Sequence, residues 1–301
     1  MIFSVSPIVL AAPGRAVELQ VKVTAPTTGE RLPIILVSHG HGASNNLSSL
    51  NGYAPLVTLL AEQGFAVIQP THLDSKTLTK QVDPDDAEAP LFWRTRALDM
   101  TRVLDRLDTI EEAVPQLKGR LDRDNVAVAG HSLGGHTASL LLGARLTDPL
   151  DGGLVDLAEL RIKAGVLLAA PGRGGDALSE FAAKNYSFFS TTDFTGMATP
   201  ALVVAGDRDA SPHLTTAGWE WHTDPYRLAP GPKDLVVLAG AEHGLGGISG
   251  YDAAETTDED PGRVATVARL VSAYLRNALL GDAEAWRDAR DSLTGGRVEG
   301  K

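Results

Sequence analysis

The chain contains no cysteine, which excludes disulfide bonds, thiolate metal sites and a cysteine nucleophile. It also lacks any run of about 18 consecutive apolar residues, so no membrane-spanning helix is expected. Basic residues are in the minority, because 27 Lys and Arg stand against 38 Asp and Glu, for a formal net charge of −11. Since the Lys and Arg residues do not cluster, this balance argues against a nucleic-acid partner or an anionic membrane surface.

Residues 1–12 lack the charged segment that opens a secretory signal peptide, and Pro7 interrupts their apolar pattern. We therefore expect a first strand there, no signal peptide and a cytoplasmic location. With 301 residues, of which 43% are hydrophobic, the chain is long enough to bury a large core. We expect a single domain over residues 1–280 and a polar C-terminal tail over 281–301. The sequence does not predict an oligomeric state.

Strand-like and helix-like patterns alternate along the chain. Residues 4–10 and 16–24, joined at Ala12-Pro13-Gly14, predict an antiparallel hairpin at the edge of a sheet. Buried strands are expected at residues 33–37, 65–69, 126–129, 164–169, 200–205 and 234–239, and helices at 53–63, 92–114, 133–145 and 261–280. This alternation predicts an α/β fold, a doubly wound and mostly parallel sheet that begins with the antiparallel hairpin.

The charged residues of the helix expected at 92–114 are interpreted as an outer face rather than a site. They are Arg94, Arg96, Arg102, Arg106, Asp99, Asp105 and Asp108. Three long connections, at residues 74–90, 171–199 and 245–260, are expected to shape a pocket. The second holds four aromatic residues that either line an acyl pocket or pack beneath the connection. These are Tyr186, Phe188, Phe189 and Phe194.

The most informative stretch is residues 126–136, Val-Ala-Val-Ala-Gly-His-Ser-Leu-Gly-Gly-His. Gly130, Ser132 and Gly134 fit the pattern G-x-S-x-G between a buried strand and a helix. In such a turn the serine hydroxyl projects above the sheet, and the positions two before and two after it must lack a Cβ because they crowd the backbone. We predict Ser132 as a nucleophile and the backbone N–H of Leu133 as one donor to a developing oxyanion.

A second glycine-rich loop, Ser38-His39-Gly40-His41-Gly42, follows the strand expected at residues 33–37. Its two glycines let the backbone approach a ligand closely, which is what a second oxyanion donor requires. We assign that donor to the backbone N–H of His41, with Gly42 as the alternative. A plain turn is the simpler interpretation of the same residues. Because the role belongs to the main chain, it makes no demand on the His41 imidazole.

A serine hydroxyl is a poor nucleophile until a base removes its proton. When the triad members occur along the chain in the order Ser, Asp, His, the base must come after the acid. The candidates are therefore the histidines beyond the loop that follows the strand expected at residues 200–205, namely His213, His222 and His243. His213 and His222 fall at the start and end of a short expected helix. His243 directly follows the strand at 234–239 among glycines, where its ring can reach over the sheet edge. We therefore favour His243 as the base.

Two carboxylates, Asp207 and Asp209, follow the strand expected at residues 200–205. Ligands of open parallel sheets bind outside the carboxyl ends of the strands, so these side chains are expected near Ser132 and His243. Asp209 is three residues past Gly206 and has room to turn back to an imidazole, whereas Asp207 is favoured as a turn former. We favour Asp209 as the acid that orients the base, with Asp207 as the alternative.

These motifs resemble the α/β-hydrolase superfamily over nearly the whole chain. Within it they are similar to the serine-esterase branch of dienelactone-hydrolase-like enzymes, chlorophyllases and platelet-activating-factor acetylhydrolases. The resemblance is carried by Ser38-His39-Gly40-His41-Gly42, Gly64-Phe65-Ala66-Val67, Thr71-His72-Leu73-Asp74 and His131-Ser132-Leu133-Gly134-Gly135. It implies the α/β-hydrolase fold and carboxylic-ester hydrolysis. It also implies a triad of Ser132, Asp209 and His243, with backbone donors at His41 and Leu133.

The chain departs from this branch at three positions. Dienelactone hydrolases proper carry a cysteine at the position of Ser132, so lactone specificity does not carry over. Chlorophyllases commonly carry an arginine at the position of Leu133, which argues against chlorophyll as substrate. The position of His41 is usually apolar in this branch.

The sequence thus predicts a serine carboxylesterase that acts on a small-molecule ester through an acyl-enzyme, with no metal or organic cofactor. The natural ester and its acyl length are left open. The same triad also serves thioester or amide cleavage, acyl transfer and perhydrolysis, which stay as alternatives. A non-catalytic binding protein on this fold is a further alternative, because fold alone does not establish chemistry. Haloalkane dehalogenase and epoxide hydrolase chemistry is excluded, since both need an aspartate at the position of Ser132.

Overall fold

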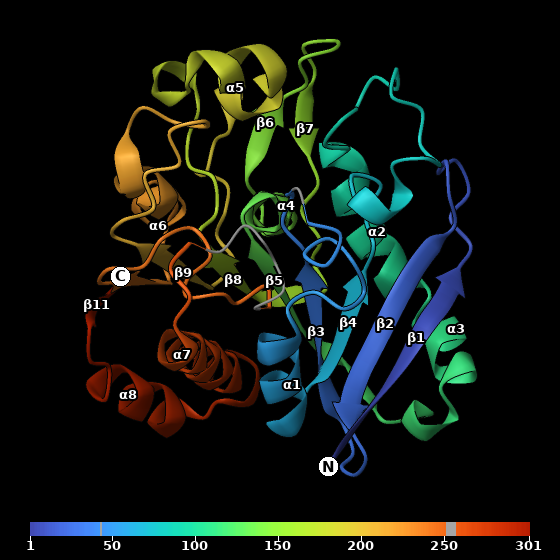
Figure 1. The fold of residues 1–301 in the computed structure, drawn as a ribbon. Helices are drawn as coiled ribbons and strands as arrows, with labels where there is room; N and C mark the ends of the chain where they lie inside the picture. Colours follow the sequence, from blue (N-terminus) through green and yellow to red (C-terminus); the bar gives the residue numbers. More distant parts are fainter. Residues whose placement is uncertain (43, 251–256) are drawn as a thin grey trace.

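The computed structural model describes residues 1–42, 44–250 and 257–301. Within these residues, a nine-stranded sheet runs through the molecule (Figure 1). Its strands are β1 (Ile2–Leu10), β2 (Leu19–Pro26), β3 (Leu32–Ser38), β4 (Ala66–Pro70), β5 (Leu121–His131), β8 (Ile162–Leu168), β9 (Ala201–Gly206), β10 (Lys233–Leu238) and β11 (Gly296–Gly300). They lie in the order β1-β2-β4-β3-β5-β8-β9-β10-β11. Strands β1 and β2 form an antiparallel hairpin, and β2 is antiparallel to β4. From β4 to β10 all neighbours are parallel. This arrangement confirms the expected α/β-hydrolase fold.

Helices cover both faces of the sheet. They are α1 (Ala54–Glu62), α2 (Trp93–Asp105), α3 (Leu107–Ala113), α4 (Leu133–Leu141), α5 (Glu180–Asn185), α6 (Asp224–Arg227), α7 (Pro261–Leu280) and α8 (Ala283–Asp291). A separate small hairpin consists of β6 (Arg145–Thr147) and β7 (Leu154–Asp156). Helices α1, α7 and α8 pack on one face, and α2, α3 and α4 pack on the other.

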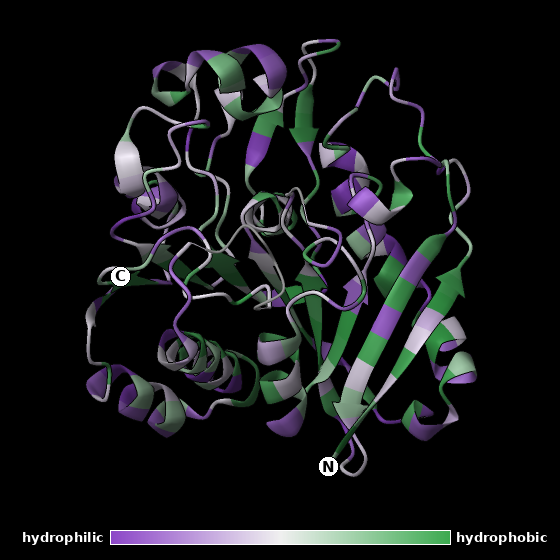
Figure 2. Ribbon diagram, in the orientation of Figure 1, coloured by the Kyte–Doolittle hydropathy of each residue, from purple (hydrophilic) through white to green (hydrophobic). Residues whose placement is uncertain are grey.

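The two cores alternate along each central strand, as the period of two in a β-strand requires. In β3, Ile34 and Leu36 join the core under α2, α3 and α4, whereas Ile35 and Val37 join the core under α1 and α7. Because both faces are covered, β3 is buried throughout and reads as a continuous apolar run. Strand β2, near the sheet edge, instead alternates between hydrophobic and hydrophilic residues, visible as changing colours along it in Figure 2.

The helix expected over residues 92–114 is two helices. The backbone leaves the helical region at Arg106, with φ −116° and ψ 21°, and α3 begins at Leu107. The sequence pattern does not reveal this break, because Leu104, Leu107 and Ile110 enter the same core on both sides of it.

The segment expected as a polar C-terminal tail contains a helix and an edge strand. Helix α7 ends at Leu280 and is capped by Gly281 in the left-handed region. The side chain of Asp282 then caps α8 by accepting from the N–H of Ala285. Trp286 is buried against α7, and β11 pairs with β10 in antiparallel register, Val298 opposite Val236. The segment is fixed because it covers the apolar side of α7 and the open edge of β10. That residues 1–280 form a single domain stays a prediction.

Strands β3, β5, β9 and β10 end at the same edge of the sheet. The four loops that the sequence singled out, which begin after Ser38, His131, Gly206 and Leu238, therefore start side by side. This edge carries the candidate site.

Candidate active site

Ser132 lies in a sharp turn between β5 and α4. Its backbone angles are φ 54° and ψ −122°, a conformation that residues other than glycine rarely adopt. A Cβ on Gly130 would lie 2.0 Å from the carbonyl oxygen of Gly134, and a Cβ on Gly134 would lie 2.0 Å from that of Ser38. Both glycines are thus required by close backbone approach, which is the reason given by the sequence pattern.

The side chains of Ser132, His243 and Asp209 form a hydrogen-bonded series. His243 Nε2 lies 2.8 Å from Ser132 Oγ, and His243 Nδ1 lies 2.7 Å from Asp209 Oδ2. Burial by itself would raise the pKa of the Asp209 carboxyl, but the His243 charge and hydrogen bonds from His222 and His243 hold that pKa well below its usual range. An ionised Asp209 only accepts hydrogen bonds, so His243 Nδ1 carries a proton and Nε2 is left to accept one from Ser132.

The alternative acid, Asp207, and the alternative bases, His213 and His222, do not contact Ser132 through the hydrogen bonds described above. Asp207 Oδ1 accepts a hydrogen bond from the Gly240 N–H at 2.7 Å, so its side chain ties the loop after β9 to the loop after β10. His213 lines the pocket described below. His222 is buried behind Asp209, with its Nε2 3.2 Å from Asp209 Oδ2. The contact between His222 and the acid was not predictable from the sequence, because His222 comes from a separate 3-10 turn 13 residues further along the chain.

The predicted backbone donors lie at the same pocket as the serine. His41, Gly42 and Leu133 all line it together with Ser132. The loop after β3 is held from below, since the N–H of Gly40 donates to the Tyr53 hydroxyl at 2.9 Å. The choice of His41 over Gly42 as second donor stays a prediction.

His131, the residue before the serine, connects three of the loops. Its Nε2 lies 2.8 Å from the carbonyl oxygen of His243, and its Nδ1 lies 2.9 Å from the hydroxyl of Tyr53. A carbonyl only accepts, so Nε2 donates to it and Nδ1 accepts from Tyr53. Burial, and next the charge of His243, lower the pKa of His131 to about 3, so its ring is neutral and this pattern is fixed.

The expected charged outer face of residues 92–114 is wrong for Arg96 and Asp99, whose side chains are fully buried. Arg96 donates to Asp74, to the carbonyl oxygen of His39 and, at 3.0 Å, to Thr137 Oγ1. It therefore joins α2 to the loop after β3, the loop after β4 and helix α4. Helical spacing contained a signal, because Arg96 falls on the buried stripe that runs through Trp93, Met100 and Val103.

Asp74 bridges Arg96 and the pocket-lining residue His41. Its Oδ2 lies 3.0 Å from Nδ1 of His41, whose side chain is 28% exposed. Burial would raise the pKa of Asp74, but Arg96, followed by the hydrogen bond from His41, holds that pKa well below its usual range. Asp99 differs, because burial outweighs its contacts with Arg15 and raises its pKa. Sequence reasoning missed this network entirely.

A pocket of about 800 Å³ opens beside Ser132. Each of the three long connections contributes to its wall, as expected, through Lys76, Tyr186, Phe189 and Ser249 among others. Residues 251–256 of the third connection lie outside the described residues. The aromatic cluster is divided between the two interpretations. Tyr186 and Phe189 line the pocket, whereas Phe188 stacks on Trp93 at 5.6 Å and Phe194 packs in the core.

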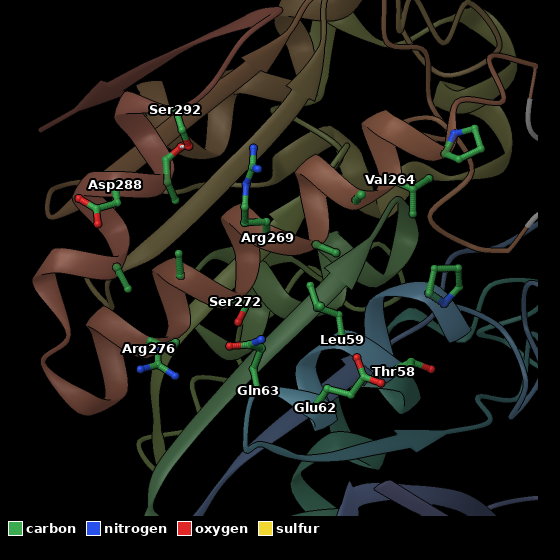
Figure 3. Close-up of a pocket in the computed structure, with 17 residues that line it drawn as sticks. Thr58, Leu59, Glu62, Gln63, Val264, Arg269, Ser272, Arg276, Asp288 and Ser292 are labelled. Carbon is green, nitrogen blue, oxygen red and sulfur yellow. Dashed lines mark hydrogen bonds between the residues drawn. The ribbon is translucent and has the colours of Figure 1, made fainter. Parts of the chain in front are cut away.

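A second hollow, of about 1090 Å³, lies between α1, α7 and α8, away from the predicted residues (Figure 3). Small residues line it, among them Ala268, Ala273 and Ala289. Charged side chains such as Glu62, Arg269 and Asp288 stand around it. Among the described residues that line it there is no histidine, so they include no counterpart of the Ser132–His243 pair.

Among the described residues, Asp209, His222 and His243 have the ligand types and the spacing for a metal ion, with their donor atoms within 4.8 Å of one another. In this structure the same atoms are occupied in contacts between imidazole and carboxylate.

Comparison with known proteins agrees with the motifs. No family model matches the chain. It is 31% identical to a platelet-activating factor acetylhydrolase from Cavia porcellus over a stretch that covers 40% of this chain and 34% of the relative. For the Bos taurus protein of the same name the identity is 28%, over 36% of this chain and 32% of the relative. The chain thus spans about a third of the length of the curated relatives it matches. The resemblance to this esterase branch is confirmed as a distant relationship.

Within the described ranges, no helix combines the length and the hydrophobicity needed to cross a bilayer.

Proposed function

We propose that this chain is a serine carboxylesterase that hydrolyses small carboxylic esters through an acyl-enzyme. The observation that carries the proposal is the position of the His243 ring, with one nitrogen 2.8 Å from Ser132 Oγ and the other 2.7 Å from Asp209 Oδ2, at a pocket beside the sheet edge. A positioned base next to a hydroxyl in a strained turn is the arrangement that nucleophilic catalysis requires. The distant similarity to acetylhydrolases supports the same reaction class.

In acylation, Ser132 Oγ attacks the ester carbonyl carbon while its proton passes to His243 Nε2. The ionised Asp209 stabilises the imidazolium that forms and keeps the proton on Nδ1, without taking it. When the tetrahedral intermediate collapses, the bond between carbonyl carbon and alkoxy oxygen breaks and His243 protonates the departing alcohol. Water then attacks the acyl-enzyme, His243 accepts its proton, and Ser132 is regenerated with release of the acid.

Negative charge develops on the carbonyl oxygen in both tetrahedral intermediates, and backbone N–H groups are proposed to stabilise it. Leu133 N–H opens helix α4, where backbone donors have no partner within the helix and the helix dipole favours an anion. His41 N–H is the proposed second donor. Such a pair removes about 3–4 kcal/mol from the barrier for each donor that engages only in the transition state.

The pocket supports an ester with an apolar part. Apolar residues contribute to its wall, among them Phe189, Leu91, Leu133 and Leu214. Removing apolar surface from water favours binding by about 25 cal/mol per Å². We propose that this wall receives the acyl chain. The related reactions of the same triad, thioester or amide cleavage, acyl transfer and perhydrolysis, differ in the acceptor or leaving group and stay as alternatives.

The test is hydrolysis of a ladder of p-nitrophenyl esters from acetate to palmitate by the wild type and by Ser132→Ala. We expect turnover by the wild type and a loss of about 10⁴-fold or more in the variant, with the chain-length optimum measuring the acyl pocket. The wild-type rate falls toward mildly acid pH as His243 becomes protonated. Equal inactivity of both proteins on every ester, or a rate that stays flat down to about pH 4, would contradict the proposal.

A further inference from the structure

The carboxylate of Asp209 is shared by two imidazole rings. Oδ2 lies 2.7 Å from Nδ1 of His243 and 3.2 Å from Nε2 of His222. The other oxygen, Oδ1, lies 2.6 Å from the hydroxyl of Ser211. Asp209 and His222 are buried, with side-chain exposures of 1% and 0%, so water does not supply these contacts.

The Ser211 hydroxyl has a single proton, and its distances show where that proton lies. Its Oγ is 2.6 Å from Asp209 Oδ1, 3.3 Å from His222 Nε2 and 3.5 Å from His243 Nδ1. A contact of 2.6 Å between a hydroxyl and an ionised carboxylate requires the proton between them. Ser211 therefore donates to Asp209 and presents only lone pairs to His222.

The two nitrogens of His222 both face acceptors. Nδ1 lies 2.9 Å from the carbonyl oxygen of Ala170, which cannot donate. Nε2 faces Asp209 Oδ2 and Ser211 Oγ, neither of which has a proton to offer. A neutral ring carries one proton, so in either tautomer one lone pair would point at an oxygen lone pair inside the protein. A ring protonated on both nitrogens satisfies both contacts.

The remaining ionisable groups near His222 leave Asp209 as its counter-ion. Burial lowers the pKa of His131 and of His213, so those rings do not add positive charge. Burial raises the pKa of Asp224, and its Oδ2 accepts from the N–H of Arg173 at 3.0 Å, whereas Asp209 is the carboxylate in direct contact with the His222 ring. The ring of His243 lies 5.6 Å from that of His222 between centroids, close enough for each ring to feel the charge of the other.

We propose that His222 is held as a buried imidazolium that shares the Asp209 carboxylate with His243, and that it positions this carboxylate and sets the pH range over which His243 acts as a base. The inference rests on the proposed function for its catalytic consequence, but the charge state of His222 does not. With part of the Asp209 charge compensated by His222, the protonated form of His243 is less stabilised. His243 then stays neutral, and the enzyme active, at lower pH than with an unshared carboxylate.

The charge state is tested first on the wild-type protein, labelled with ¹⁵N-histidine, by two-dimensional NMR of the ring nitrogens at pH 7. His222 is assigned by the resonances that disappear in His222→Gln. We expect both of its nitrogens at the shifts of a protonated imidazolium. One protonated and one unprotonated nitrogen would overturn the inference. This experiment needs no substrate, so its outcome is independent of whether the chain hydrolyses esters.

The catalytic consequence is tested by the pH dependence of kcat/KM on a p-nitrophenyl ester. In His222→Gln we expect the acid limb to move to higher pH by about half to one unit, because His243 keeps the whole carboxylate charge. The control is Arg227→Gln, which removes one positive charge on the exposed surface of α6 and leaves the limb in place. An unmoved limb in a folded His222→Gln protein, or a shift to lower pH, would contradict the proposal. Absence of ester turnover in the wild type would instead refute the proposed function alone.

Discussion

The ring of His131 donates from Nε2 to the carbonyl oxygen of His243 at 2.8 Å. The residue before the proposed nucleophile thus holds the main chain of the proposed base. On its other side His131 accepts from the hydroxyl of Tyr53, which accepts from the N–H of Gly40. This chain of three hydrogen bonds fixes the loops after β3, β5 and β10 relative to one another, and it holds Ser132 and His243 at reacting distance.

Replacing His131 by Phe keeps an aromatic ring but removes both hydrogen bonds. We expect kcat to fall about 10- to 100-fold with little change in KM, because a small displacement of a catalytic base costs rate rather than binding. Steady-state kinetics on the best p-nitrophenyl ester measures this. The companion variant Tyr53→Phe removes the hydroxyl that accepts from Gly40 and donates to His131, but it keeps the His131–His243 hydrogen bond and is expected to cost less. Unchanged kcat in a folded His131→Phe protein would show that the His243 loop is held by other contacts.

Asp209 and Asp207 are two residues apart, and their contacts predict different roles. Asp209→Asn is expected to lower kcat by about 10³- to 10⁴-fold, because an amide no longer fixes the proton on His243 Nδ1. Asp207→Asn is the matched control, since its side chain accepts from the Gly240 backbone and not from His243. We expect it to retain at least a tenth of the activity. If the two variants exchanged these effects, Asp207 would be the acid.

Arg96 is expected to be a large contributor to stability. Arg96→Met leaves the buried Asp74 without its cation, which costs about 3–5 kcal/mol of unfolding free energy. The control Arg123→Met removes partly exposed ion pairs with Asp108 and Glu111 and should cost about 1 kcal/mol or less. Urea denaturation measures both. Adding Asp74→Asn to Arg96→Met should destabilise by less than the sum of the single changes, because the unpaired charge is then gone.

The unfolding free energy is expected to decrease as the pH falls below about 6.5, before the carboxylates begin to take up protons. Burial lowers the pKa of four histidines, to about 3 for His131 and His136 and well below the usual value for His39 and His72. Between about pH 6.5 and 3 the unfolded chain binds protons at these positions and the folded chain does not, so the unfolding free energy decreases as the pH decreases. Each histidine contributes about 1.4 kcal/mol per pH unit in this window.

His136 allows that slope to be tested by one change. Its ring packs against Phe188 and Phe189, and its two nitrogens have no hydrogen-bond partner among the described residues. Between pH 6 and 4, the slope of unfolding free energy against pH should be smaller in His136→Phe than in the wild type, by about 1.4 kcal/mol per pH unit. Above pH 8 the two slopes should be the same. Parallel curves at acid pH would show that His136 is not neutral in the folded chain.

The parts of this fold that repeat a local rule could be predicted from the sequence. Helix α7 spans Pro261–Leu280 as expected, because a capping Asp260, an early proline, an apolar stripe and a terminal Gly281 all agree. The turn at Ser132 was predictable for a similar reason, since two steric contacts at Gly130 and Gly134 leave few other residues possible. These features depend on neighbours within a few positions.

The parts that depend on distant partners could not be predicted in this way. A charged residue is expected at the surface unless its partner is known. The partner of Arg96, Asp74, lies 22 residues earlier, and that of His222, Asp209, lies 13 residues earlier. The strand β11 is polar and short, and it forms because β10 presents an open edge rather than because its own residues favour a strand.

The central claim is that Ser132 is an activated nucleophile. The most direct measurement is reaction with a fluorophosphonate, in which a serine Oγ–phosphorus bond forms and fluoride leaves, followed by intact-mass analysis and peptide mapping. We predict one adduct per chain, on the peptide that contains Ser132, absent from Ser132→Ala and formed more slowly as the pH falls. No adduct with the wild-type protein at excess reagent, or an adduct on another residue, would contradict the account.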